Sequence, residues 1–512
     1  MAEVFSFWPA GMDLANAYLW KKTIFAPRIE NIVVSKSNKT RNLLELIRGG
    51  ESITLAQQLE LTFRLSMPAI MAQLSSIIMQ YIDASMVGRL GANQAASIGL
   101  VSTTTWLFNG LCGAAVTGFA VQVAHRIGAN DNSGARNILR QSIVAVSMFC
   151  LLLTFIGTSI SGFLPHWLGG SADITDDASA YFRIFALSLP ALQFIYFSGS
   201  MLRCSGNMKI PSMLNVMMCV FDVIFNALLI FPSHQYNVLG LSISLPGADM
   251  GVRGAALGTA LAEVVTSVFM TSYLLFRSHE LKLTQDSGSF KPTLPILGKA
   301  FRISLPVGCE RVVMCGAQIV STGIVAPIGV NALAANTFAI TAESLCYMPG
   351  YGVSEAATTL VGQCVGARRR YLPKRFSRIT VLLGMSIMTI MGIIMYFAAP
   401  LMMSIMTPFE EIQSLGVMAL RIEAFAEPMF AAAIVSYGVF VGAGDAFIPS
   451  MMNLGSMWVV RLTLAALLAP SMGLQGVWIA MCIELCFRGF IFLLRLKSGR
   501  WMKTIDKMKA NP

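Results

Sequence analysis

Acidic and amide side chains inside apolar stretches are the residues of this sequence best suited to chemistry. Asp83 stands in an apolar stretch, three residues after Gln80. Asp222 and Asn226 are four residues apart, a spacing that places both on one face of a helix. An ionisable group inside a membrane costs free energy unless it is paired, hydrated or neutralised, so it marks a functional site by default. We therefore predict that Asp83, Asp222 and Asn226 form a functional site that could hold a cation, and that Gln80 contributes to a substrate site.

Five glutamates farther along the chain are predicted to line the substrate-binding site: Glu310, Glu343, Glu355, Glu423 and Glu427. Glu423 and Glu427 are four residues apart, and Pro428 is expected to bend the helix there. Glu310 directly precedes Arg311, so an ion pair that merely neutralises both is the alternative for Glu310. Structural ion pairs are expected instead for four other charged residues: Glu263, Arg461, Glu484 and Arg488.

Buried carboxyl groups could drive the exchange of one cation for another. In a low-dielectric cavity a carboxyl group binds a proton more readily, whereas a nearby cation favours the ionised form. A site that holds either a proton or an organic cation, but not both, exchanges them by competition. Sodium would need several oxygen ligands, which Asp83, Asp222 and Asn226 could help to supply. Both H⁺ and Na⁺ therefore stay open as the coupling ion, and no cofactor or resident metal is predicted.

The composition is that of a membrane protein. Of the 512 residues, 55% are hydrophobic and 12% are charged, whereas soluble domains average roughly 25% charged residues. We assign the net charge of +11 to cytoplasmic loops, where membrane proteins gather Lys and Arg, and expect no nucleic-acid partner. The sequence contains no metal-ligand spacing, Walker loop or nucleotide fingerprint, so we do not expect an enzyme.

Twelve apolar segments are long enough to cross a bilayer, which takes roughly 20 residues. We predict an all-α integral membrane protein whose twelve transmembrane helices form two six-helix repeats around a central cavity. The segments are 65–88, 94–125, 138–164, 178–202, 211–231, 252–276, 303–326, 333–363, 378–406, 416–441, 449–470 and 474–496. The second helix of each half is longer than the bilayer requires and should tilt or project into water.

Basic residues gather in the loops on one side of the predicted membrane. Sixteen Lys and Arg residues lie around the ends of even-numbered segments, whereas only Arg89 and Arg253 follow odd-numbered ones. The positive-inside rule then places the even-numbered loops and both termini in the cytoplasm. We expect a multi-pass protein of the cell membrane, most simply a bacterial inner membrane.

A short sequence that occurs twice shows that the chain contains two copies of one folding unit. Residues 63–68 (Phe-Arg-Leu-Ser-Met-Pro) recur as 301–306 (Phe-Arg-Ile-Ser-Leu-Pro), and the offset of 238 aligns further prolines and glycines. Each copy has six segments, so both begin on the same side of the membrane. The predicted parts are a cytoplasmic tail, an N-terminal bundle, a cytoplasmic linker, a C-terminal bundle and a second cytoplasmic tail, at 1–60, 61–276, 277–300, 301–497 and 498–512. Within the first tail, Met1–Trp20 is expected to be an interfacial amphipathic segment.

The two candidate acids of the first copy, Asp83 and Asp222, have no acidic counterparts in the second. Asp83 aligns with Ser321, and Asp222 aligns with Val460. The fold therefore does not require these carboxyl groups, which favours a functional role for them.

Several stretches resemble the multidrug and toxic compound extrusion (MATE) family. They are Met-Pro at 67–68, Tyr-Ile-Asp-Ala-Ser-Met-Val-Gly-Arg-Leu-Gly around Asp83, Pro-Gly-Tyr-Gly-Val-Ser-Glu-Ala-Ala-Thr-Thr-Leu-Val-Gly-Gln at 349–363, and Gly-Ala-Gly-Asp before Pro449. The resemblance covers the chain from about residue 60 to about residue 497. It implies a cation-coupled antiporter that expels amphipathic, often cationic organic compounds, with Asp83 in the coupling path. The chain departs from the family where Asp222 precedes Asn226, because some members have Asn then Asp, and where Glu427 replaces a common Gln.

Transport by alternating access is the function that two parallel bundles support best. The expected partners are organic cations and the lipid bilayer, and the expected assembly is a monomer. The alternative is a flippase for lipid-linked precursors of the same superfamily. That alternative predicts a cationic cavity and often fourteen helices, whereas this chain has twelve predicted helices and mainly acidic groups within them.

Overall fold

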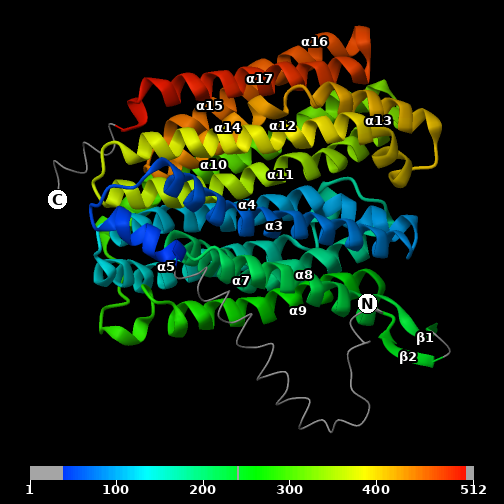
Figure 1. Ribbon diagram of the computed structural model, residues 1–512. Helices are drawn as coiled ribbons and strands as arrows, with labels where there is room; N and C mark the ends of the chain where they lie inside the picture. The colour runs from blue at the N-terminus through cyan, green and yellow to red at the C-terminus, as the bar shows by residue number, and fades with distance from the viewer. Residues whose placement is uncertain (1–38, 239–240, 503–512) are drawn as a thin grey trace, which may run out of the picture.

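The fold consists of two bundles of long helices that lie side by side (Figure 1). The structure is a computed structural model, and it describes residues 39–238 and 241–502. The interfacial segment predicted for Met1–Trp20 lies outside the described residues, as does most of the predicted C-terminal tail. A helix over residues 39–48 precedes the first long helix.

Six long helices make up the first half and match the six predicted segments. They are α3 (Leu55–Gly88), α4 (Ala92–Gly128), α5 (Asn132–Ile160), α7 (Ala172–Cys204), α8 (Lys209–Ile230) and α9 (Gly251–Ser272). One turn of helix, α6 (Leu164–Trp167), precedes α7, and the π-helical turn η3 (Tyr273–Arg277) extends α9. An antiparallel hairpin of β1 (Pro232–Val238) and β2 (Leu241–Ala248) joins α8 to α9. The sequence analysis did not predict this hairpin.

The second half repeats this order after the 3₁₀ turn η4 (Leu283–Gln285). Its elements are α10 (Leu294–Val325), η5 (Ala326–Ile328), α11 (Val330–Gly366), α12 (Leu372–Met406), α13 (Glu410–Glu423), α14 (Glu427–Gly442), α15 (Phe447–Gly455), η6 (Ser456–Leu462), α16 (Thr463–Met472), α17 (Leu474–Ser498) and η7 (Arg500–Met502). The helices α13 and α14 meet at a bend of 61°, which confirms the break predicted at Pro428.

The helices account for the twelve predicted spans. Among the described residues, ten helices are long and apolar enough to cross a membrane, and the bent pair of α13 and α14 makes an eleventh span. The remaining helix, α11, carries Glu343 and Glu355 and completes the twelve. The second helix of each half, α4 or α11, has 37 residues, so the prediction that these two helices exceed the bilayer thickness is confirmed.

Glycines set the geometry at both ends of these two long helices. Gly91 and Gly329 precede α4 and α11 with φ of 137° and 136°, values that side chains rarely allow. At the other end the helices cross so closely that a Cβ on Gly128 would lie 2.2 Å from the backbone oxygen of Gln363. A Cβ on Gly366 would lie 2.0 Å from the backbone oxygen of His125. The two halves therefore meet backbone to backbone at this crossing.

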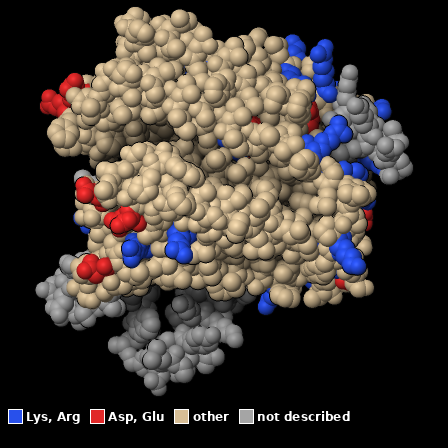
Figure 2. Space-filling model, turned by 180° about the vertical axis from the view of Figure 1, so that it is seen from behind, with Lys and Arg blue, Asp and Glu red and all other residues tan. Residues whose placement is uncertain are grey.

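Charged side chains gather at the two ends of the helices. Figure 2 shows most of the visible Lys and Arg at one end, several Asp and Glu near the other, and a broad uncharged band between them. A groove separates the two halves on this face (Figure 2). We call the end that holds the α4–α5 and α11–α12 loops the basic end, and the opposite end the acidic end. The uncharged band is the surface expected to face lipid.

Candidate functional site

Asp83, Asp222 and Asn226 meet in one cluster between α3 and α8. The amide nitrogen of Asn226 donates to Asp83 Oδ1 and to Asp222 Oδ2, each at 3.0 Å. Asp222 and Asn226 share a face of α8, as their spacing predicted. The packing of α8 against α3 then brings Asp83 to them. The structure thus unites the three residues that were predicted to couple to a cation.

This first-half cluster is buried and has more acceptors than donors. Asp222 is 0% exposed and Asn226 is 1% exposed. Within the described chain, Asp222 Oδ1 and Asn226 Oδ1 have no hydrogen-bond partner. Since most buried polar atoms have a partner, the Asp222 oxygen is suited to accept a proton, and both oxygens are suited to coordinate a small cation. Gln80 is exposed, and no hydrogen bond among the described residues joins it to the cluster.

The helix α9 closes this cluster and brings a third acid near it. A Cβ on Gly258 would lie 2.0 Å from Asn226 Oδ1, so only glycine leaves room for the amide. Glu263, also on α9, is 7% exposed, and its Oε2 has no hydrogen-bond partner in the part of the chain described. Its charge interacts with that of Asp222. The ion pair expected for Glu263 is wrong, and the sequence analysis missed its proximity to the cluster.

Glu310 forms a second cluster, in the other half. Its carboxylate accepts hydrogen bonds from Tyr437 Oη at 2.7 Å, Ser450 Oγ at 2.6 Å and Asn453 Nδ2 at 2.7 Å. Glu310 is 7% exposed, and no ion pair joins it to Arg311 among the described residues. The predicted alternative of a neutralising pair with Arg311 is therefore wrong.

The partners of Glu310 were missed by the sequence analysis, although a signal for two of them exists. Ser450 and Asn453 belong to the repeated segment Ile-Pro-Ser-Met with its following Asn, and they align with Ser212 and Asn215. A polar pair retained in both copies of an apolar helix could have been singled out. Tyr437 aligns with a glycine and gives no such signal.

Glu343, Glu423 and Glu427 lie near one another around the bend between α13 and α14. Glu343 is 2% exposed, and the other two are 0% exposed. Both carboxyl oxygens of Glu423 and of Glu427 have no hydrogen-bond partner among the described residues. The three charges interact, and Arg461 of η6 is near enough to act on Glu343 and Glu423. These three acids form one group that could bind protons or cations.

The expected ion pairs of the second half are confirmed for one pair only. Glu484 and Arg488 form a buried pair with an N–O distance of 2.6 Å. Arg461 makes no ion pair in the described residues, and its guanidinium contacts two methionine sulphurs instead.

Glu355 lies apart from both groups of acids and connects the two halves. Its Oε2 is 3.5 Å from Arg203 Nε on α7, and its Oε1 accepts a hydrogen bond from Gln73 on α3 at 3.4 Å. The carboxylate therefore has a basic partner already. The structure does not bring Glu355 together with the other four glutamates of the predicted substrate site.

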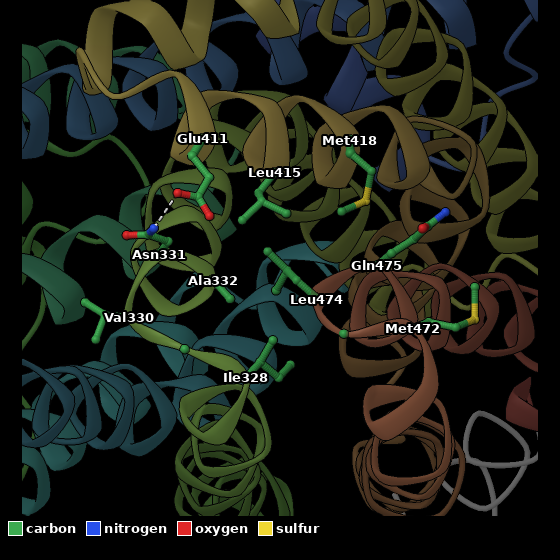
Figure 3. Close-up of a pocket in the computed structure, with 12 residues that line it drawn as sticks. Ile328, Val330, Asn331, Ala332, Glu411, Leu415, Met418, Met472, Leu474 and Gln475 are labelled. Carbon is green, nitrogen blue, oxygen red and sulfur yellow. Dashed lines mark hydrogen bonds between the residues drawn. The ribbon is translucent and has the colours of Figure 1, made fainter.

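A pocket of about 450 Å³ opens at the acidic end of the second half. Figure 3 shows its lining from α11, α13 and the turn before α17, with Asn331 donating to Glu411 at 2.7 Å. None of the predicted site residues lines it. Since its one acid already has a partner, this pocket adds nothing to the acid clusters described above.

Two parallel six-helix repeats with carboxyl groups held inside their spans define a multi-pass membrane transporter. The model of the MatE family matches residues 68–228 and 306–467, one stretch in each repeat. The chain belongs to the MATE family, whose members are transporters and not enzymes, and the resemblance found in the sequence is confirmed.

Curated relatives and solved structures agree with this assignment. "Probable multidrug resistance protein NorM" of Thermotoga maritima is 24% identical over 86% of this chain and 92% of that protein. The protein of the same name from Pseudomonas aeruginosa is 25% identical over 82% of this chain and 85% of that protein. Among structures, "Crystal structure of MATE in complex with MaL6" matches with a TM-score of 0.80 at 21% identity, covering 91% of this chain and 99% of that one. A mutant of the Vibrio cholerae MATE transporter VcmN matches with a TM-score of 0.78 at 17% identity, covering 91% and 99%. These structural matches show that the fold is shared.

Proposed function

We propose that this protein is a secondary antiporter that exports amphipathic or cationic organic compounds in exchange for H⁺ or Na⁺. The two halves alternate between openings on either side of the membrane, and the protein works as a monomer with both termini in the cytoplasm. The basic end then faces the cytoplasm. In a bacterium, the site of action is the inner membrane.

The observation that carries the proposal is the first-half cluster. It holds two carboxyl groups and one amide inside a span, and its unpartnered oxygens offer a place for a small cation. A cation that binds there changes the charge beside the groove between the halves. That change can be linked to the release of an organic cation held by the glutamates of the second half, because a bound H⁺ or Na⁺ offsets negative charge that would otherwise attract the organic cation.

The relatives support an organic substrate, because several of them carry the name multidrug resistance protein. The acids also support it, since Glu343, Glu423 and Glu427 give the second half an acidic interior. This interior fits a cationic substrate better than the anionic head of a lipid-linked precursor.

The test is the movement of a fluorescent organic cation, ethidium, in proteoliposomes under an imposed H⁺ gradient or an imposed Na⁺ gradient. The native protein is compared with Asp83→Asn, which removes one carboxylate of the first-half cluster at constant size. Asp173→Asn is the matched control, because Asp173 is an exposed acid in the first turn of α7.

Each outcome decides a different point. Loss of gradient-driven movement in Asp83→Asn but not in Asp173→Asn supports antiport through the cluster, and the effective gradient identifies the ion. Unchanged movement in Asp83→Asn moves the coupling to the acids of the second half. No ethidium movement under either gradient overturns the cation-export proposal and favours a flippase.

A further inference from the structure

Most of the hydrogen bonds that join the two halves lie toward the basic end, whereas the one from Tyr81 Oη to the backbone oxygen of Thr341 lies toward the acidic end. Gln363 of α11 donates to the backbone oxygen of Cys204 at 2.8 Å, and Thr359 of α11 donates to that of Arg203 at 3.2 Å. His125 of α4 and the backbone oxygen of Gly442 are 2.9 Å apart. Together with the glycine crossing of α4 and α11, these contacts close the basic end between the halves.

A separate segment lies over this closed end, and we call residues 39–53 the strap. The strap consists of the helix 39–48 and the five residues after it. Its apolar face carries Leu43, Leu44 and Ile47, which are 5%, 2% and 0% exposed. These side chains pack with Leu360 and Cys364 of α11 and with the start of α12 in the second half, and also with Leu61 and Leu65 of α3 in the first half. The strap precedes the first half in the chain and is held by both halves.

Arg48 is the polar centre of the strap. Its side chain is 7% exposed and donates to three acceptors: Ser205 O at 3.2 Å, Glu280 Oε1 at 3.4 Å and Gln363 Oε1 at 3.2 Å. Ser205 follows α7 of the first half, Glu280 belongs to the linker, and Gln363 belongs to the second half. One guanidinium therefore connects both halves and the linker.

The linker is the repeat counterpart of the strap. An offset of 238 places Arg48 opposite Asp286 of the linker. Asp286 accepts from Arg136 at 2.8 Å and is 2.6 Å from a guanidinium nitrogen of Arg140, both on α5 of the first half. The linker thus precedes the second half and is bound to the first, whereas the strap precedes the first half and reaches across to the second through Gln363 and Arg369, so the two segments cross at the basic end.

The two crossed segments differ in how firmly they are held. The linker has an ion pair with two arginines of α5. The strap lies beside a pocket of about 290 Å³ that it shares with the linker and the α4–α5 loop. The end of the strap is fixed by Arg369, which donates to the backbone oxygens of Gly50 and Glu51. A short segment at the end of the helices can open locally at lower cost than a long helix inside a bundle can.

We propose that the strap is a detachable lock, in which Arg48 holds the cytoplasmic side closed and must release Gln363 before that side can open. This inference rests on the proposed alternating access and adds a positioning residue that lies outside the transport site. Separation of the halves at the basic end would pull Ser205 and Gln363 apart. Arg48 cannot bond to both in that state, so the strap stabilises the closed state alone.

The test is backbone hydrogen exchange of the full-length protein in lipid nanodiscs, comparing the native chain with Arg48→Gln. Exchange in the strap should rise about tenfold, because a charged donor with three acceptors is lost. Exchange should also rise in the last turns of α4 and α11 at the basic end and fall in the first turn of α11 at the acidic end. Arg41→Gln is the matched control, because among the described residues Arg41 forms an ion pair with Glu45 of its own helix and with no other acid.

A shift in opposite directions at the two ends is a change of state that a merely structural role would not produce. Arg48→Lys, which keeps the charge but not the three-way contact, should restore part of the native pattern. Faster exchange confined to the strap would overturn the proposal, as would an unchanged pattern. If Arg48→Gln does not fold, Arg369→Gln, which is partly exposed, should loosen the end of the strap and give the same pattern weakly. Since the readout needs no substrate, failure of the ethidium assay would not be confused with failure of the lock.

Discussion

The two halves place their polar clusters on the same pair of helices but at different depths. In the first half, Asp83 on the first helix meets Asp222 and Asn226 on the fifth. In the second half, Glu310 on the first helix meets Ser450 and Asn453 on the fifth. Glu310 aligns with Ala72, about 11 residues before Asp83, which is roughly 16 Å along a helix. The first-half cluster therefore lies nearer the acidic end, and the Glu310 cluster nearer the basic end.

The two clusters also differ in how well their oxygens are satisfied. The carboxylate of Glu310 has three donors, whereas the first-half cluster has one amide group between two carboxyl groups and leaves oxygens unpartnered. A satisfied carboxylate stabilises the fold, and an unsatisfied group is available to a ligand. The two copies thus share one frame but differ in how their buried carboxyl groups are bonded.

The largest effect is expected when Glu310 is removed. Glu310→Ala leaves Tyr437, Ser450 and Asn453 without their acceptor inside the bundle, and should lower the free energy of unfolding by about 3 kcal/mol or more. Thermal unfolding in one detergent measures the change. Glu310→Gln keeps one acceptor oxygen and should lose clearly less. Equal stability of Glu310→Ala and the native chain would contradict the structural role.

The opposite behaviour is expected for Asp222. Asp222→Asn should reduce gradient-driven transport about 100-fold, which corresponds to roughly 2.7 kcal/mol in the barrier. Stability should stay the same or rise, because the new amide can donate to an unpartnered oxygen of Asn226. Transport in proteoliposomes and thermal unfolding of the same preparation separate the two effects. A variant that loses stability but keeps transport would remove the distinction between the clusters.

A smaller effect is expected at Glu355, which belongs to neither cluster. Glu355→Gln breaks the ion pair with Arg203. The side chain of Glu355 is 30% exposed and that of Arg203 is 17% exposed. Partly exposed pairs contribute little, so the loss in unfolding free energy should stay below about 1 kcal/mol. A double-mutant cycle with Arg203→Gln measures the coupling directly. A coupling of several kcal/mol would mean that this pair holds the halves together.

The smallest effect is expected at Asp286, and it should not change between neutral pH and about pH 5. Hydrogen bonds from Arg136 and Arg140 lower the pKa of Asp286 from 3.8 to about 2. The carboxylate therefore holds the linker at any pH above its ordinary pKa, and this contribution is lost as the pH falls through about 2. In Asp286→Asn the amide hydrogens of the linker should exchange faster than in the native chain. The ratio of the two exchange rates should be the same from about pH 7 to about pH 5. A factor that changes across this range would point to another titrating group.

The periodic and compositional features of the fold were predictable from the sequence. Residue type and spacing predicted four features: the twelve apolar segments, the two repeats, the length of α4 and α11, and the bend at Pro428. Helix ends were predicted less well, because the apolar residues that mark a span end at the membrane surface, whereas the helices continue into water. The helix α10, for example, begins at Leu294, before the predicted start of its span. The strap lies inside a segment that was predicted as a tail. Its helix of ten residues is too short to give the apolar pattern by which the spans were recognised.

The site was predictable only where its members share one helix. Asp222 and Asn226 are joined by helical spacing, and the structure confirms that they are in contact. The contacts of Asp83 with Asn226 and of Glu310 with Tyr437 depend on packing between helices. One sequence without tertiary information cannot supply such pairings.

The glycine crossing of α4 and α11 bears on how the chain arose. Gly128 aligns with Gly366, and His125 with Gln363, so each half presents corresponding positions to the other. A contact between corresponding positions of two copies is the kind that a symmetric homodimer makes. A single repeat that carried these positions could have paired with a second copy of itself before the two genes were fused. Fusion then freed each copy to acquire its own acids while the shared contact kept them together.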